Sequence, residues 1–405
     1  MKKILFVDDE PNILQALKRS LRNMRVEWDM DFAISGDKAL EILAQERFDV
    51  IVTDMRMPGM NGLELLNAVR NKYPYIIRFV LSGHADKDFI LRSVGPIHQY
   101  LTKPCDTDEL KTMINKACST NGLLIDSKLQ ELISQMETLP SLPLLYTKLM
   151  AELESPEASI KSVAKIISQD IGMSAKILQL VNSTFFGIRH HVASPEQAVS
   201  LLGMDIVSAL VLSINVFEQF DSMTLEALSL SELWNHSRNV GMFAKKIAEY
   251  EKIDNKSKDY AFIAGLLHDI GKLILAVNIP ETYKSVIEDA RKMQKSVIEG
   301  ELKNFGVTHE KIGGYLMGLW GFPQPVIEAI ASHHSSDDIP SDTINPLTAV
   351  KYANIIEHKL FQDGKMSYHV KIDVSHLKEH GLDTKFPIWE SVCQQIADEA
   401  SKNES

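Results

Sequence analysis

Residues 3–10 read KILFVDDE, a short apolar run that ends in three acidic residues, and the next hundred residues repeat this kind of run four times. The later runs are DFAI at 31–34, DVIVT at 49–53, IIRFVLS at 76–82 and QYLT at 99–102. Stretches with helical periodicity follow them at 11–24, 37–46, 62–72, 84–93 and 107–118. Five strands that alternate with five helices predict an α/β fold with a doubly wound five-stranded parallel sheet.

Charged and polar side chains stand where these strands end. Asp8 and Asp9 follow the first strand, Asp54 the third and Lys103 the fifth, while Ser82 ends the fourth. In such sheets the ligand site lies at the carboxyl ends of the strands, so these side chains should meet there. Three carboxylates in one place repel each other unless a cation binds, and oxygen ligands favour Mg²⁺. A lysine and a hydroxyl can bind phosphate oxygens, which predicts phosphoryl transfer to a carboxylate.

The motifs at these strand ends resemble those of a known family. VDDE at 7–10, TDMRMPGMNG at 53–62, LSG at 81–83 and YLTKP at 100–104 resemble the receiver domain of bacterial response regulators, and the resemblance covers residues 1–120. It implies that Asp54 is the phosphoacceptor and that a sensor histidine kinase or phosphotransfer protein is the partner. It also implies that Asp9, Asp54 and the backbone carbonyl of Arg56 hold Mg²⁺, while Asp8 assists through water.

In the same family, Ser82 and Tyr100 would form the switch pair that reports phosphorylation to the fourth helix, fifth strand and fifth helix. Taken singly, these residues have simpler explanations. The acids before Pro11 could cap a helix, and an aromatic residue at a strand end can be ordinary packing. The whole set at matching strand ends is what favours the receiver interpretation.

Composition excludes several other classes. The 405 residues carry a net charge of −11 and no Lys/Arg cluster interleaved with aromatics, so nucleic-acid binding is not expected. The apolar run at the N-terminus is too short for a signal peptide or a membrane span, and no membrane association is expected. The cysteines at 105, 118 and 393 lack metal-ligand spacing, which favours reduced thiols and a cytoplasmic location.

Residues 121–138 are predicted to be a helical connector, after a break at 118–122 that is rich in Ser, Thr, Asn and Gly. Leu129, Leu132, Ile133 and Met136 give this helix one apolar stripe. The stripe could pack on the second half of the chain, or it could pair two copies of the protein as a homodimer. Both alternatives stay open.

From 139 to 385 the helical periodicity predicts an all-α multi-helix domain, followed by a C-terminal helix and tail at 386–405. The predicted helices cover 144–154, 159–168, 173–182, 195–201, 204–219, 231–250, 257–278, 280–293, 297–304, 308–319, 323–333 and 346–361.

Histidines and acids recur along these helices at positions that would let them converge. They are Glu232, His236, His268, Asp269, His309, His333 and His334. Imidazoles and carboxylates from several helices are the ligands that a hydrolytic Fe, Mn or Zn site needs, because the metal makes a bound water acidic enough to attack phosphorus.

This set resembles the HD superfamily of phosphohydrolases, and the surrounding segments narrow the resemblance to the HDOD family over 139–360. The segments include LPSLP at 139–143, NSTFFG at 182–187, AGLLHDIGKL at 264–273, HEKIGGYLMGLWGFP at 309–323 and AIASHH at 329–334. HDOD domains are HD-like output modules that usually have no established catalysis.

Two departures concern the metal site. Where HD-type cyclic di-GMP phosphodiesterases have their last metal aspartate, this chain has Asn354, and SSDDIP follows His334 in place of their Gly-Tyr-Pro loop. Glu357, one turn after Asn354, could substitute. The cluster is therefore either a packing or structural-metal remnant or a hydrolytic site, in which Lys272 would contact phosphate.

The leading hypothesis is signal relay, in which phosphorylation of Asp54 changes how an essentially non-catalytic HDOD domain contacts a protein target. The cyclic di-GMP system is one source of such a target. The alternative is a phosphorylation-regulated, metal-dependent HD-type phosphodiesterase.

Overall fold

In the computed structural model of the 405-residue chain, the described residues are 1–82, 97–103, 106–119, 158–182, 191–204, 230–293, 295–335, 344–361 and 381–403. Shorter described pieces lie at 133, 139–141, 148–149, 152–153, 155, 207, 217–219 and 377. The predicted helix at 84–93 lies outside the described residues. So does the predicted connector at 121–138, apart from a buried Ile133.

The N-terminal part is a parallel sheet with strand order β2-β1-β3-β4-β5, which confirms the predicted doubly wound fold. The strands are β1 (Lys2–Val7), β2 (Trp28–Ala33), β3 (Val50–Asp54), β4 (Ile77–Ser82) and β5 (Gln99–Thr102). The described helices are α1 (Pro11–Ser20), α2 (Gly36–Gln45), α3 (Gly62–Lys72) and α5 (Thr107–Ser119), with a 3-10 helix η1 (Arg22–Val26).

The carboxyl ends of the strands lie together because every strand pairing in this sheet is parallel. Asp54 at the end of β3 pairs with Leu81, and Ser82 at the end of β4 pairs with Thr102. All five residues of β3 are buried, as expected for a central strand covered on both faces. A capping box between Asn61 and Glu64 begins α3 directly after the β3 turn.

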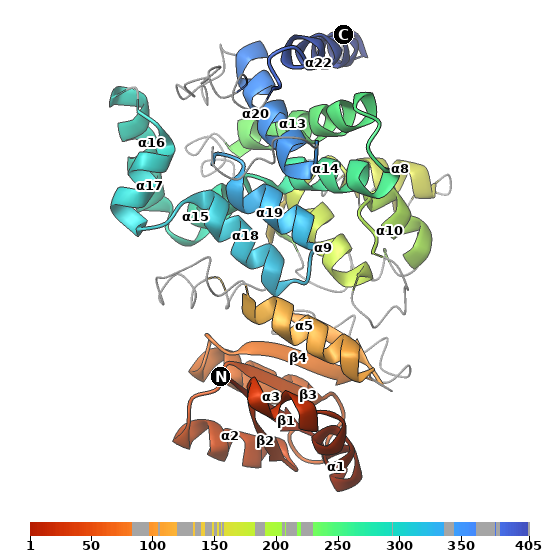
Figure 1. The fold of residues 1–405 in the computed structure, drawn as a ribbon, viewed down its shortest axis with the longest axis vertical. Coiled ribbons are helices and arrows are strands. Elements are labelled where there is room, and N and C mark those ends of the chain that lie inside the picture. The colour runs from red at the N-terminus through yellow and green to blue at the C-terminus, as the bar shows by residue number, and fades with distance from the viewer. Residues whose placement is uncertain are drawn as a thin grey trace.

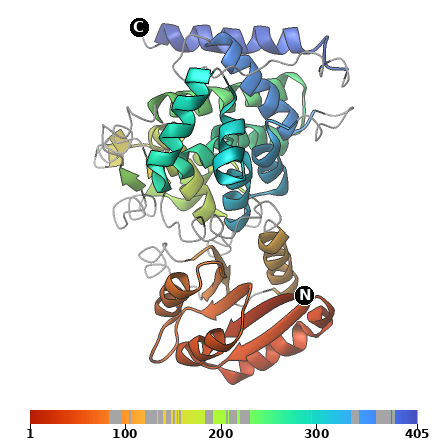
Figure 2. The same ribbon diagram turned by 90° about the vertical axis from the view of Figure 1, so that its left-hand side faces the viewer.

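The second part is helical, as predicted. Its helices are α8 (Ile160–Ile167), α9 (Ile171–Val181), α10 (Pro195–Leu202), α13 (Leu230–Tyr250), α14 (Asn255–Leu267), α15 (Ile270–Asn278), α16 (Pro280–Met293), α17 (Val297–Phe305), α18 (His309–Leu319), α19 (Gln324–Ser332), α20 (Pro346–Leu360) and α22 (Phe386–Asn403). Figures 1 and 2 show these helices above the sheet, with α5 between the two parts and α22 at the far end.

One predicted helix is wrong at its end. The helix predicted at 204–219 finishes in a strand, β7 (Phe217–Gln219), which pairs in parallel with β6 (Leu139–Ser141). The partner strand β6 is extended because Leu139 precedes Pro140, and a residue before proline is restricted to extended backbone. Pairing with β6 requires residues 217–219 to be extended as well. The helical domain therefore contains a two-stranded sheet that periodicity did not reveal.

A second correction concerns the helix predicted at 257–278, which is two helices. The chain leaves helical geometry at Asp269 (φ −97°, ψ 12°), between α14 and α15. By length and hydropathy the stretch Asn255–Asn278 could cross a membrane, but 89% of its most apolar window is buried inside the protein. Most of the stretch is therefore buried in the helical part, and its break places His268 and Asp269 in the core.

Candidate functional site

The strand ends of the sheet form the first candidate site. Lys103 reaches back across the strand ends, and its Nζ lies 2.7 Å from Asp8 Oδ2 and 2.6 Å from Asp54 Oδ1. Asp8 and Asp54 are both buried, and Asp8 Oδ1 also accepts a hydrogen bond from the Glu10 backbone N–H at 2.9 Å. Three of the residues predicted from the strand ends are therefore in direct contact.

The charges at the strand ends shift the pKa values of the side chains that meet there. Burial raises the pKa of Asp54, and the nearby Asp8 charge adds to this, while Lys103 opposes it. Burial by itself would lower the pKa of Lys103, but its contacts with both carboxylates raise it. Two buried carboxylates that share one ammonium group still carry excess negative charge, which Mg²⁺ would offset.

Asp9 and Arg56 line a cavity of about 500 Å³ beside Asp54, together with Met55, Met57, Pro58 and Asn61. The turn is held in place at Gly62, whose N–H donates to the Met55 carbonyl at 3.0 Å. A Cβ on Gly62 would lie 2.1 Å from the Asp54 carbonyl oxygen, so only glycine fits there. Asp9 and Arg56 thus lie next to Asp54, and their roles as Mg²⁺ ligands stay predictions.

The predicted switch residues occupy neighbouring strands. Ser82 is the last residue of β4, and Tyr100 is fully buried in β5. Burial raises the pKa of Tyr100 far above its usual value, so the phenol stays neutral. Their role as a switch pair stays a prediction, because the preceding helix of that face lies outside the described residues.

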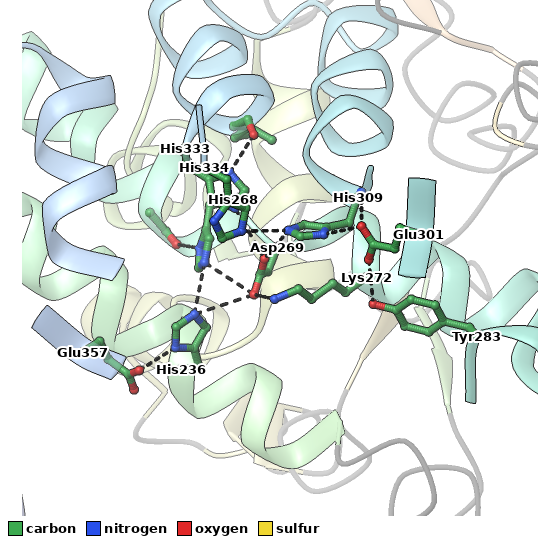
Figure 3. A network of polar contacts seen from close by, with 12 residues as sticks. His236, His268, Asp269, Lys272, Tyr283, Glu301, His309, His333, His334 and Glu357 are labelled. Atoms are coloured by element: carbon green, nitrogen blue, oxygen red, sulfur yellow. Dashed lines mark hydrogen bonds and ion pairs between the residues drawn. The ribbon is translucent and has the colours of Figure 1, made fainter. Parts of the chain in front are cut away.

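The second candidate site is the cluster of histidines around Asp269 (Figure 3). On one side, His236 Nε2 lies 3.1 Å from His268 Nε2 and 3.6 Å from Asp269 Oδ2. On the other side, His309 Nε2 lies 3.2 Å from His334 Nε2 and 3.2 Å from Asp269 Oδ1. Asp269 is fully buried and stands between the two groups, with one carboxylate oxygen toward each.

Four of these imidazoles are fixed in the same tautomer, because each Nδ1 faces a group that can only accept a hydrogen bond. The acceptors are Glu357 Oε2 for His236 (2.6 Å), the Gly265 carbonyl for His268 (2.7 Å), Glu301 Oε2 for His309 (2.7 Å) and the Ile330 carbonyl for His333 (2.8 Å). The proton of each neutral ring is therefore on Nδ1. The Nε2 atoms point into the cluster, and each has a free lone pair whenever its ring is neutral.

Facing lone pairs are unfavourable unless a cation lies between them. His236 and His268 present theirs to each other across 3.1 Å. Among the described residues, buried His333 Nε2 and Asp269 Oδ1 have no hydrogen-bond partner, although they lie 3.7 Å apart. Ligand atoms of Asp269, His309, His333 and His334 all lie within 4.8 Å of one another. These donors fit a nitrogen- and oxygen-ligated metal such as Fe, Mn or Zn.

Ionisation in the cluster is strongly perturbed. Burial, with help from neighbouring imidazoles, holds the pKa of His268 and of His334 well below the usual value, so both rings are neutral. Burial by itself would lower the pKa of His309, but the Glu301 carboxylate raises it to about 9. Burial would raise the pKa of Asp269, but the Lys272 ammonium and contacts with the surrounding imidazoles hold it well below the usual value.

Some predicted residues take no part in these contacts. Glu232 lies one turn before His236 on α13, and its buried Oε2, like His333 Nε2, has no hydrogen-bond partner among the described residues. Asn354 is buried, and its Oδ1 is likewise without a described hydrogen-bond partner. Lys272 is not a solvated helix residue, because it is buried with its Nζ 2.7 Å from Asp269 Oδ2. The Lys272 ammonium therefore neutralises part of the negative charge of Asp269.

Sequence patterns missed the residues that support the histidines from behind. Glu301, on α17, is fully buried, and it holds both the ring and the backbone N–H of His309. Tyr283 donates its hydroxyl to Glu301 Oε1 at 3.3 Å. His358 packs on His236 with ring centroids 4.7 Å apart. Motif spacing gives no signal for these residues, because their partners lie on other helices.

The two parts of the chain contact each other at residues 319–322, the end of α18 and the turn after it, which we call the α18–α19 corner. Gln99 of β5 donates its Nε2 to the Leu319 carbonyl at 3.0 Å, and Lys116 of α5 donates its Nζ to the Gly321 carbonyl at 2.9 Å. Gly321 has a left-handed φ of +77°, and a Cβ there would lie 3.3 Å from the Gln99 side chain. The corner is therefore fitted closely to the sheet domain.

Helix α9 completes this interface from the helical side. Gln179 donates its Nε2 to the His98 carbonyl at 3.3 Å, and Lys176 places its Nζ 4.8 Å from the ring centroid of Trp320. Burial lowers the pKa of Lys116 to about 8 and that of Lys176 to about 7. Helix α18 begins at His309 and ends at the corner. Helix α19 begins after the corner and ends directly before His333, so both helices connect the corner to the histidine cluster.

Comparison with known proteins identifies both parts. Residues 4–115 match the family model described as response regulator receiver domain, and residues 139–336 match the HDOD domain model. A protein of Treponema pallidum is 27% identical over 58% of this chain and 44% of its own length. The hydrogenase transcriptional regulatory protein HoxA of Cupriavidus necator is 33% identical over 38% of this chain and 31% of its own length. The chain thus spans less than half the length of these relatives.

Among solved structures, the MmoQ response regulator of Methylococcus capsulatus is similar over 61% of this chain and 93% of that one, at 22% identity and a TM-score of 0.49. The receiver domain of an HD domain-containing protein from Pseudomonas fluorescens is 30% identical over 30% of this chain and 97% of that one, with a TM-score of 0.28.

Proposed function

The chain belongs to the response regulators in which a receiver domain is followed by an HDOD domain, and on that premise we propose that phosphorylation of Asp54 controls the HDOD domain through direct contact. A phosphodonor such as a sensor histidine kinase would supply the phosphoryl group. Asp9, Asp54 and the Arg56 backbone carbonyl would hold Mg²⁺, with Asp8 assisting through water. The Lys103 ammonium, already 2.6 Å from Asp54, balances charge on the phosphoryl oxygens.

The observation that carries the proposal is the interface at the α18–α19 corner. Phosphorylation removes Lys103 from its present partners, because the new phosphoryl oxygens compete for the same ammonium group. Lys103 directly follows β5, the strand whose first residue, Gln99, is bonded to Leu319. A shift of β5 would therefore reach the helices that carry the histidine cluster without any intermediate protein.

The output itself is proposed to be a change of contacts in the cytoplasm and not catalysis. A protein target, including an enzyme of cyclic di-GMP metabolism, or a second copy of this chain would bind or leave the HDOD surface. Asn354 supports this proposal, because a neutral amide is a poor ligand between two cations. The missing Gly-Tyr-Pro loop after His334 supports it as well.

A second candidate function is favoured by one observation, the facing Nε2 atoms around Asp269. His236 and His268 would hold one cation and His309, His333 and His334 another, with Asp269 between them. Such a metal would activate a water for attack on a phosphodiester. Lys272, at 2.7 Å from Asp269, stands where it could also contact a phosphate oxygen. This would be a phosphorylation-controlled phosphodiesterase.

The relay is tested on the full chain with Mg²⁺ and a small phosphodonor. We expect one acid-labile phosphoryl group on Asp54 and a change in amide hydrogen exchange at the α18–α19 corner. Asp54→Asn should lose both, whereas Asp37→Asn, in the exposed first turn of α2, should retain both. Labelling of Asp54→Asn at the wild-type level would show that the phosphoacceptor is misassigned. Labelling of the wild type without any change at the corner would exclude the proposed route.

A further inference from the structure

Helix α20 carries a buried acidic residue, Glu357, behind the histidine cluster. We propose that Glu357 supplies to the histidine cluster the negative charge that Asn354 lacks, by holding His236 from behind, so that the centre binds cations despite the asparagine. The inference rests on the cation centre of the second candidate function. It does not require that the centre hydrolyses anything.

The position of Glu357 fits this role. It lies three residues after Asn354 on α20, so the two side chains leave adjacent parts of the same helix face. Its Oε2 is 2.6 Å from His236 Nδ1, and its Oε1 accepts from Asn239 Nδ2 at 3.3 Å. Both oxygens of a buried carboxylate are thus engaged, one of them on a ligand histidine. By contrast, Asn354 Oδ1 has no hydrogen-bond partner among the described residues.

The other half of the cluster is built in the same way. Glu301 Oε2 is 2.7 Å from His309 Nδ1, as Glu357 Oε2 is 2.6 Å from His236 Nδ1. Each group of histidines therefore has one carboxylate behind it, with Asp269 between the groups. A carboxylate in this position fixes the orientation of the ring, makes Nε2 a stronger electron-pair donor to a metal and adds negative charge next to the cation.

Charge arithmetic also requires Glu357. The described carboxylates in contact with the cluster are Asp269, Glu301 and Glu357, and the Lys272 ammonium offsets one of them. Without Glu357 the His236 side would have only a share of Asp269, whose Oδ2 is already 2.7 Å from Lys272. A divalent cation held by neutral imidazoles alone is poorly compensated in a buried site. Glu357 is therefore a positioning residue for this side.

The test is a substitution that removes charge and little else. Glu357→Gln keeps the size of the side chain and an oxygen that can accept from Nδ1. The full chain is freed of metal and titrated with Mn²⁺, and with Co²⁺ to follow its visible absorption spectrum. Removing such a carboxylate typically costs about 10- to 100-fold in metal affinity, and we expect a loss of that size. The matched control is Glu328→Gln on the exposed face of α19, which should bind as the wild type does.

A rescue variant separates charge from folding. If Glu357 stands in for the absent aspartate, Asn354→Asp should raise affinity by a much larger factor in the Glu357→Gln background than in the wild type, and should restore the Co²⁺ spectrum. Equal factors in the two backgrounds would contradict the inference, and so would a Glu357→Gln protein with wild-type affinity. A wild type that binds neither metal would instead exclude the cation centre itself, together with this inference. Labelling of Asp54 is measured separately and is independent of these outcomes.

Discussion

Gly271 offers the sharpest test of how packing positions the histidine cluster. It is the second residue of α15, directly behind Asp269 and Ile270, and it lies against the start of α18. A Cβ built on Gly271 would lie 1.9 Å from the His309 carbonyl oxygen and 2.6 Å from its carbonyl carbon. Both contacts are with backbone, so no side-chain rotation can relieve them. Gly271→Ala must separate α15 from α18.

The size of the effect follows from these distances. To bring the 1.9 Å contact to 3.0 Å, the shortest separation real Cβ atoms show, the two helices must move apart by about 1.1 Å. Overpacking of this kind costs about 1–3 kcal/mol, and the better helix propensity of alanine returns up to about 1 kcal/mol. A net loss of about 1–2 kcal/mol lowers the Tm of a domain of this size by roughly 2–8 °C.

The displacement also moves His309 relative to Asp269, whose Oδ1 now lies 3.2 Å from His309 Nε2. Ligand sites tolerate only about 0.5 Å of misplacement, so cation affinity should fall at least about tenfold. The assay combines thermal unfolding in chelator with Mn²⁺ titration of the full chain. Gly381→Ala is the control, because its φ of +64° imposes strain of about 1–2 kcal/mol while no atom lies within 4 Å of the new Cβ.

The control should lose stability and keep its cation affinity, whereas Gly271→Ala should lose both. If Gly271→Ala melted and bound Mn²⁺ as the wild type does, the close packing of α15 on α18 could not be what positions His309.

Two further predictions concern output and interface. With Mn²⁺ or Fe²⁺ the wild type should not appreciably hydrolyse cyclic di-GMP. The neutral Asn354 lacks the charge of an aspartate, and one such electrostatic contribution is typically worth about 10²- to 10³-fold in rate. Hydrolysis by the wild type that disappears in the double variant His268→Ala, Asp269→Ala would instead favour the phosphodiesterase. Burial at the corner lowers the pKa of Lys116 from 10.5 to about 8, so the docked form binds fewer protons than the separated form between these values, and docking should strengthen as pH rises through that window. Small-angle scattering should show that the chain becomes more compact as pH rises through this window. In Lys116→Met the contribution of Lys116 to this pH dependence, up to about 3 kcal/mol of docking free energy, should be absent.

The sequence by itself determined the fold of the receiver part and the side chains that meet at its strand ends. Short apolar runs, helical stretches and the acids at their junctions predict the parallel sheet, and a parallel sheet necessarily brings its strand ends to one edge. The contact of Lys103 with Asp8 and Asp54 follows from that topology alone. In the helical part, periodicity located most helices, and the motifs around His268 and His309 identified the HDOD resemblance.

Only the tertiary structure decided which side chains of the helical part come into contact with one another. Periodicity describes one helix at a time, so it could not show that a predicted helix breaks at Asp269, or that Lys272 turns inward to that carboxylate. Nor could it show that Glu301 and Glu357 stand behind His309 and His236, since each pair joins different helices. The same holds for the fit of the corner against β5 and α5. These contacts depend on how helices cross, which is set by packing over the whole domain and not by the spacing of residues along the chain.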